Sequence, residues 1–240
     1  MDTAFGAPAT YAWRGVSLVV SAFGAIASVL PLPSLAADDP VTARGNEPSW
    51  QVTIGGSEIE LVTNMGADRV TFPTPAPIKT TVYAIPDKGV TISVAEQICR
   101  DTMSGMVFPL SVTVAGASDA PLAGCGGEPA SLLSGDEWIV ESIGGQPVVA
   151  NSQVTLAFGD NNHLSGAASC NRYFASWKLS GEGLSIADVG STMMACAEPG
   201  VSEQEAAFLA AVTTVSAFDI ADDGALNLLA GGDTVIVARR

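Results

Sequence analysis

The chain has 240 residues, of which 48% are hydrophobic and 15% charged, which excludes a disordered chain because disorder needs low hydrophobicity with high charge. Ten Lys and Arg residues stand against 25 Asp and Glu residues, so the formal net charge at pH 7 is −15. This charge makes nucleic acids and anionic lipid surfaces poor partners, and we expect no nucleic acid to bind, since each phosphate contact needs a cation.

The N-terminus has the pattern of a secretory signal peptide. Arg14 supplies the positive charge, and a following apolar run ends at two prolines. Small side chains at Ser34 and Ala36 favour cleavage ahead of Ala37. The alternative is a retained anchor, but the run is broken by prolines and a span needs about 20 residues. We expect residues 1–36 to be a signal peptide and the mature protein to be soluble, without a stable membrane anchor, in the periplasm or outside the cell.

The four cysteines agree with an oxidising compartment. Cys99, Cys125, Cys170 and Cys196 all follow the predicted cleavage point, and an even number in a secreted chain indicates disulfides. Three connectivities are possible. We favour Cys99–Cys125 with Cys170–Cys196, because each pair then lies within one candidate domain. A zinc site is disfavoured, since the chain has no CxxC pair and a single His; we expect no metal and no cofactor.

After a polar leader over residues 37–47, the first half alternates short β-branched runs with turn residues, a pattern typical of antiparallel strands. A proline-rich stretch over residues 72–77 is restricted to a loop or a sheet edge. The strands are expected at residues 50–54, 59–62, 70–72, 80–85, 90–94 and 107–114.

A Gly-rich break over residues 124–135 permits a hinge, and the strand pattern restarts at Trp138. Further strands are expected at residues 138–143, 153–158, 163–168, 173–179, 184–187, 218–221, 225–229 and 234–238. Ser202 and Glu205 have the spacing of a capping box, which predicts a helix beginning there. Its apolar stripe consists of Phe208, Leu209, Val212 and Val215.

These patterns predict an α+β fold that is mostly β. It consists of two small antiparallel, barrel-like sheet domains, the second carrying one packed helix.

The second half resembles the META domain, the family of the bacterial heat-shock protein HslJ, over residues 131–240. The resemblance rests on Trp138-x-Val140, Leu156-x-Phe158, Leu164-Ser-Gly166-x-x-x-Cys170-Asn171-Arg172-Tyr173, Thr192-Met-Met-Ala-Cys196 and Glu205-x-x-Phe208-Leu209. It implies a curved sheet with a single helix, and it supports Cys170 and Cys196 as partners. Ser169 stands where the family usually has glycine.

The first half, over residues 44–128, is similar to an uncharacterised bacterial envelope and lipoprotein-type domain. The similarity rests on Gly45-Asn46-Glu47-Pro48-x-Trp50, Cys99-x-Asp101-x-Met103-Ser104-Gly105-x-x-Phe108 and Leu122-x-Gly124-Cys125-Gly126. Together the two resemblances imply a stress-associated envelope protein. Neither supplies a set of catalytic residues.

Catalytic arrangements find little support in the sequence. A hydrolase triad would have to use His163, but no nucleophile elbow accompanies it, so an exposed turn residue is favoured. The adjacent acidic pairs, such as Asp222-Asp223, point to opposite faces of a strand and are expected in solvated turns. Asp160-Asn161-Asn162 lacks the glycine and terminal glutamate of a calcium loop.

The segment around Asn171 and Arg172 is the best candidate for a ligand or partner contact. Arg172 is one of few cations and suits a carboxylate or phosphate, whereas Asn171 is favoured to pin the turn beside the disulfide. Arg100 and Asp101 are expected to form an ion pair within their domain. Met193-Met194 is expected to pack in the core rather than bind a soft metal.

The sequence therefore predicts a non-enzymatic, stress-associated envelope protein that binds an unknown envelope protein or small ligand. One alternative is an inhibitor of a basic periplasmic hydrolase such as lysozyme, steered by the negative charge. A carboxylate-dependent hydrolase is the least favoured alternative.

Overall fold

A computed structural model describes residues 40–75 and 82–240. The predicted signal peptide and the cleavage point ahead of Ala37 lie outside these residues. Within them, no helix combines the length and the apolar character that a membrane crossing requires.

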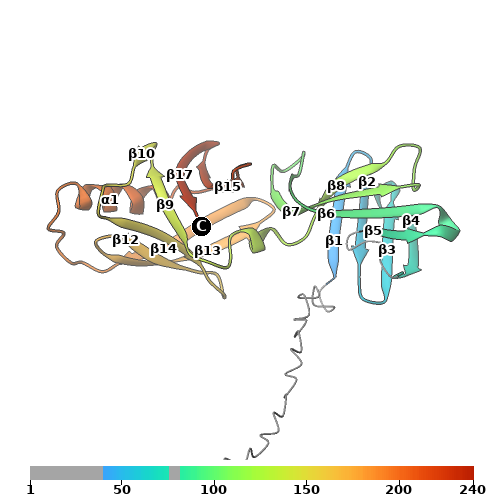
Figure 1. The fold of residues 1–240 in the computed structure, drawn as a ribbon, viewed down its shortest axis with the longest axis horizontal. Coiled ribbons are helices and arrows are strands. Elements are labelled where there is room, and N and C mark those ends of the chain that lie inside the picture. The colour runs from blue at the N-terminus through green and yellow to red at the C-terminus, as the bar shows by residue number, and fades with distance from the viewer. Residues whose placement is uncertain (1–39, 76–81) are drawn as a thin grey trace, which may run out of the picture. The chain divides into compact units, whose positions relative to one another are not determined.

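The first sheet is antiparallel throughout and has the strand order β4-β3-β2-β1-β8-β7-β6-β5 (Figure 1). Its strands are β1 (Val41–Asn46), β2 (Ser49–Ile54), β3 (Glu58–Thr63), β4 (Asp68–Pro73), β5 (Val82–Ile85), β6 (Val90–Arg100), β7 (Val107–Ala115) and β8 (Leu122–Gly126). The proline-rich stretch begins at the end of β4, an edge strand, as predicted, because an edge does not need every N–H.

The alternation of buried and exposed residues along these strands forms one core. Trp50, Val52, Ile59, Ile92 and Val112 are among its buried members. The described part of the polar leader contains a strand, because β1 covers residues 41–46 and pairs with both β2 and β8. Ala43 contributes to the core while its neighbours face solvent, so the apolar signal of β1 was too short to be seen in the sequence.

The second sheet has the order β14-β13-β12-β11-β9-β17-β16-β15, with β10 paired to β9. Its strands are β9 (Trp138–Ile143), β10 (Gln146–Pro147), β11 (Gln153–Phe158), β12 (His163–Ser169), β13 (Arg172–Ser180), β14 (Gly183–Ser191), β15 (Ala217–Ile220), β16 (Leu226–Ala230) and β17 (Asp233–Arg239). The two end strands approach each other, since Leu184 N, near the start of β14, donates to Ser216 O just before β15 at 3.0 Å. The sheet therefore curves almost into a barrel.

The single α-helix of the described residues, α1 (Val201–Val212), contacts β9, β12 and β17 (Figure 1). Phe208 and Val212 are fully buried, and the Phe208 ring meets the Tyr173 ring edge-on with centroids 5.0 Å apart. The predicted stripe is correct for these residues. Val215 is also buried, but it lies beyond the helix end.

The Gly-rich segment over residues 124–135, whose composition permits a hinge, contains regular secondary structure. Gly124 and Gly126 belong to β8, and a 3-10 turn, η3 (Pro129–Leu132), follows. Leu133 is completely buried and its carbonyl accepts a hydrogen bond from Trp138 Nε1 at 3.0 Å. The fold class is confirmed: mostly β, two antiparallel sheets, and one helix packed on the second.

Candidate functional site

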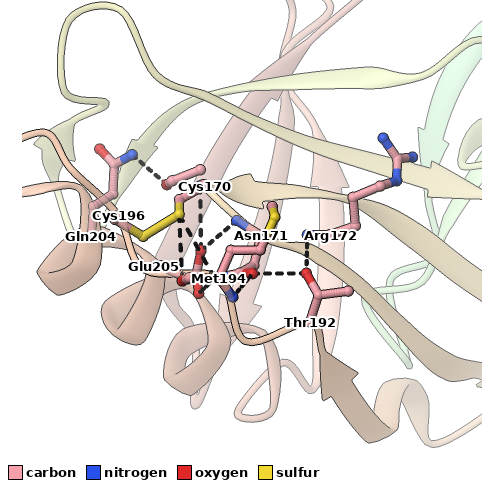
Figure 2. The surroundings of a disulfide bond; sticks show 9 residues. Cys170, Asn171, Arg172, Thr192, Met194, Cys196, Gln204 and Glu205 are labelled. Carbon is pink, nitrogen blue, oxygen red and sulfur yellow. Dashed lines mark hydrogen bonds between the residues drawn. A yellow bond between two sulfur atoms is a disulfide. The ribbon is translucent and has the colours of Figure 1, made fainter.

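Ser169, Cys170 and Asn171 form the turn between β12 and β13, and Asn171 is only 4% exposed. Its amide uses all four of its hydrogen-bonding positions within the protein (Figure 2). The oxygen accepts from Thr192 Oγ1 and from Met194 N, each at 2.7 Å. The nitrogen donates to Met194 O at 3.2 Å and to Glu205 Oε1 at 2.8 Å. The amide of Asn171 is therefore engaged in holding the turn, and no polar atom of it is left for a ligand.

Glu205 joins the helix to this turn. Its Oε2 accepts from Asn171 N at 2.8 Å and from Cys170 N at 3.3 Å, while Oε1 takes the Asn171 side chain. The predicted capping box is wrong, because the N-cap residue is Gly200 and no side chain caps the helix. The Glu205 carboxylate, which the capping-box pattern assigned to the N-terminus of α1, instead accepts three hydrogen bonds from Cys170 and Asn171.

Ser169 explains why glycine is usual at its position. Its φ is +104°, a region that residues with a side chain rarely adopt. Its hydroxyl accepts from Gln204 Nε2 at 2.7 Å, and the same nitrogen donates to Ser152 Oγ at 2.8 Å. The hydrogen bond with the helix offsets part of the backbone strain. Gln204, a buried polar residue of α1, carried no signal in the sequence that marked it as part of this cluster.

The cysteines form the disulfides Cys99–Cys125 and Cys170–Cys196, with Cα separations of 5.4 and 5.7 Å. Ligand-type atoms of Cys170, Cys196 and Glu205 lie within 4.8 Å of one another, the one such group found in residues 40–75 and 82–240. The two sulfurs form a disulfide, so the cluster offers no thiolate for a metal. The Glu205 carboxylate already accepts hydrogen bonds from Cys170 and Asn171.

Arg172 behaves differently from its neighbour. Its backbone N–H donates to Thr192 Oγ1 at 3.2 Å, but its exposed side chain points away from the disulfide cluster (Figure 2). Phe174, two residues along β13 on the same face, is 57% exposed. A β-carbon on Gly190, its partner on β14, would lie 2.5 Å from the Phe174 ring, so the ring lies directly over this glycine.

The prediction that Met193 and Met194 pack in the core is wrong. They are 97% and 60% exposed, because the segment between β14 and α1 is held by backbone contacts to Asn171 rather than by its side chains.

The remaining catalytic candidates are not brought together. His163 is exposed at the start of β12, next to a turn in which Asn161 and Asn162 have positive φ. Asp223 pairs with Arg239 at 2.6 Å, and Glu137 accepts from Thr155 Oγ1 at 2.7 Å. These carboxylates have ordinary structural partners.

A second polar cluster lies beside the other disulfide. The Asp101 carboxylate accepts from the Asn46 amide and from both the N–H and the hydroxyl of Ser104. Burial raises the pKa of Asp101, but the hydrogen bonds from Ser104 and Asn46 and the charge of Arg44 outweigh it, so its pKa lies below the usual value.

The predicted Arg100–Asp101 ion pair is wrong. Arg100 instead donates to both carboxylate oxygens of Asp219, at 2.9 and 3.1 Å, and to the carbonyl of Ile220 at 2.8 Å, while the Asp101 carboxylate is occupied by Asn46 and Ser104.

Two glycines of the first sheet also belong to this cluster. A β-carbon on Gly45 would lie 2.2 Å from Trp50 Nε1, and one on Gly124 would lie 2.8 Å from Trp50 Cζ2 and 2.1 Å from Arg44 O. Both glycines therefore make room for the buried tryptophan. The residues that carried the resemblance of the first unit thus gather at one place in the sheet.

The family model of the META domain matches residues 131–240, which contain β9 to β17 and α1. A solved structure described as "NMR structure of the protein" shares 24% identity, covers 45% of this chain and 92% of its own, and has a TM-score of 0.37. Another, "NMR structure of the protein from Burkholderia xenovorans", shares 26% identity over 47% of this chain and 88% of its own, also with a TM-score of 0.37. No curated protein matches the chain.

Proposed function

With residues 131–240 taken as a META domain, we propose that the protein is a non-enzymatic binding protein of the bacterial envelope that acts in stress tolerance. Its contact with a partner protein is made by the outer face of β13, at Arg172 and Phe174. The observation that carries the proposal is the exposure of these two side chains on a strand that is rigidly held from the other side.

Support for the binding face comes from its chemistry. Arginine and aromatic side chains are enriched at the centres of protein interfaces, because they bury a large area with few rotatable bonds. The Phe174 ring already lies over Gly190, so little conformational freedom is lost on binding. The neighbours in register, Ser165 on β12 and Gly190 on β14, are small and let a partner approach closely.

Support for the compartment comes from the two disulfides, one in each sheet, which form and persist in oxidising surroundings. The stress role is an implication of the family resemblance and follows from no residue of the chain.

The test is capture from an envelope extract with the immobilised protein, at low and moderate salt. The double change Arg172→Ala with Phe174→Ala should abolish capture of the specific partner. Ile139→Ala, which removes another half-exposed apolar side chain of the same sheet, should leave it intact. Thermal unfolding of each variant checks that the fold persists. Equal capture by the double variant and the wild type would refute the assigned face.

A second candidate function rests on the net charge of −15. A strongly acidic protein is steered toward basic enzymes by long-range fields, so an inhibitor of a basic hydrolase such as lysozyme is the alternative. Inhibition of lysozyme by the purified protein, weakening steeply between low and physiological salt, would favour it. An Arg172 and Phe174 double variant that still inhibits would separate it from the first proposal.

A further inference from the structure

Three hollows meet at Arg44 of β1; two are lined by the first sheet and its turns, and one is lined also by Leu179 and Ser180 of β13. One, of about 360 Å³, is also lined by Asn46, Ser49, Gln51, Val62 and Met65. A second, of about 260 Å³, includes Gln51, Ser104, Met106 and Phe108, and a third, of about 190 Å³, includes Asn46, Asp101 and Thr102. The largest has the size of pockets that hold small molecules. Several of these residues belong to the motifs of the first unit, and the proposed function uses none of them.

Arg44 has no acceptor for its guanidinium among residues 40–75 and 82–240. Its one described contact is with the face of the Phe108 ring, 5.6 Å from the ring centroid. Other arginines are paired: Arg69 with Glu60, Arg100 with Asp219 and Arg239 with Glu141 and Asp223. The cation of Arg44 is thus stacked in a fixed direction while its N–H fork stays open.

Asp101, which lines the third hollow with Arg44, does not neutralise this cation by direct contact. Asp101 lowers the local potential, but its oxygens are already occupied by Asn46 and Ser104. The charge of Arg44 acts on Asp101 only through space. An anion that entered the hollow would therefore meet an arginine without having to displace a bound carboxylate.

The walls of the largest hollow combine polar and apolar groups. Arg44, Gln51 and Val62 are neighbours in register on β1, β2 and β3. The side chains of Gln51 and Ser49 are exposed and form no hydrogen bond with the described residues, so their N–H and O–H groups are available. At the rim, Met65 is 92% exposed and has a φ of +53°, an unfavourable conformation for a residue with a long side chain.

We infer that this part of the first sheet binds a small organic monocarboxylate through Arg44. The guanidinium fork takes the carboxylate in a bidentate contact, Gln51 and Ser49 donate to it, and a short apolar group lies against Val62 and Met65. Arg100 also lines the third hollow, but it is paired with Asp219, so Arg44 is the one unpaired cation of the site. A single unpaired cation suits a single negative charge better than a phosphate dianion. The site shares no residue with the proposed contact at Arg172 and Phe174, so either assignment can fail without the other.

The test is a titration of the full-length, isotope-labelled protein followed by its amide NMR signals. Hexanoate is the probe, with acetate, hexylammonium and inorganic phosphate as comparison probes. We expect saturable shifts of the Gly45, Gln51 and Gly66 amides by hexanoate below about 10 mM. Acetate should bind about tenfold more weakly because it lacks the apolar group, and hexylammonium should cause no saturable shift.

Arg44→Gln should weaken hexanoate binding at least about tenfold, the loss expected for a charge-assisted contact. The affinity of Arg44→Lys for hexanoate should lie between those of the wild type and Arg44→Gln, because lysine keeps the charge without the guanidinium fork. Arg69→Ala, which removes the same charge from the same sheet outside the hollows, should bind like the wild type. If Arg44→Gln loses the dispersed spectrum, Gln51→Leu at an exposed position serves instead and should also weaken binding. No saturable shift in the wild type, unchanged binding by Arg44→Gln, or tighter binding of phosphate than of hexanoate would each overturn the assignment.

Discussion

Each sheet holds a polar loop beside a disulfide, and the two are built alike up to a point. In the first, the amide of Asn46 donates to the carboxylate of Asp101; in the second, the amide of Asn171 donates to Glu205. Each disulfide joins cysteines 26 residues apart. The difference lies in the nearest arginine. The second cluster is saturated and its Arg172 points to solvent, whereas the first leaves Arg44 open over three hollows.

The comparison teaches that a polar cluster in a β-sheet is not by itself a binding site. Where every donor and acceptor is paired inside the protein, the cluster stabilises a turn. A ligand contact is sought instead at the charged groups that the cluster leaves unpaired.

Removal of the disulfides should have the largest effect. Replacing Cys99 and Cys125, or Cys170 and Cys196, with alanine should each lower the free energy of unfolding by about 3 kcal/mol, because the loops have equal length. Urea denaturation of both variants measures this. A loss confined to one pair would show that native contacts of the loop, rather than chain entropy, dominate at that site.

Glu205→Ala should come next, with a loss of about 2 to 3 kcal/mol, because two N–H groups of the turn and the Asn171 amide lose their acceptor. The control is Glu203→Ala, which removes the same side chain from the exposed side of α1 and should cost about 0.5 kcal/mol. Similar losses in the two variants would contradict the role given to Glu205.

Asp101 should contribute a pH-dependent part of the stability. Its pKa in the folded protein is below the unfolded value of about 3.9. The stabilisation is therefore complete above about pH 4 and is lost as the pH falls through the lower folded pKa. The free energy of unfolding, measured between pH 6 and pH 2, should fall less with decreasing pH for Asp101→Asn than for the wild type. An equal fall in the two proteins would count against this assignment.

The smallest effects are expected at Ser169. Glycine there should relieve about 1 kcal/mol of backbone strain and lose one hydrogen bond of similar value, leaving stability nearly unchanged. Ser169→Ala keeps the strain and loses the bond, so it should be about 1 kcal/mol less stable than the glycine variant. Thermal unfolding of the two variants measures this difference in stability. An alanine variant more stable than the glycine variant would be incompatible with the strained φ of Ser169.

Local patterns were sufficient for most of the fold. Period-two alternation located most of the strands, since each has one buried face, and apolar spacing located Phe208 and Val212 on α1. The start of α1 was misjudged because Glu205 is claimed by donors 34 and 35 residues away, a contact that no local pattern reports. β1 was missed because it buries few apolar side chains and depends on pairing with β8, which is distant in sequence.

The candidate site was predicted only in part. The sequence placed Asn171 beside the disulfide and favoured a structural role, and the hydrogen bonds agree with that preference. The exposure of Phe174 was not predictable, because an aromatic residue in a strand is more often buried, and here it covers a glycine of the neighbouring strand. The hollows around Arg44 are lined by residues of many strands that are distant in sequence, and sequence spacing does not encode how these strands meet.

The central claim, that the outer face of β13 contacts a partner, is tested most directly by photo-crosslinking in living cells. A photoreactive phenylalanine analogue is placed at position 174, and in a matched protein at position 139, which is also about half exposed. We expect a discrete crosslinked species from position 174 that is absent from position 139 and lost when Arg172 is changed to alanine. The same crosslinks from both positions, or none from position 174, would contradict it.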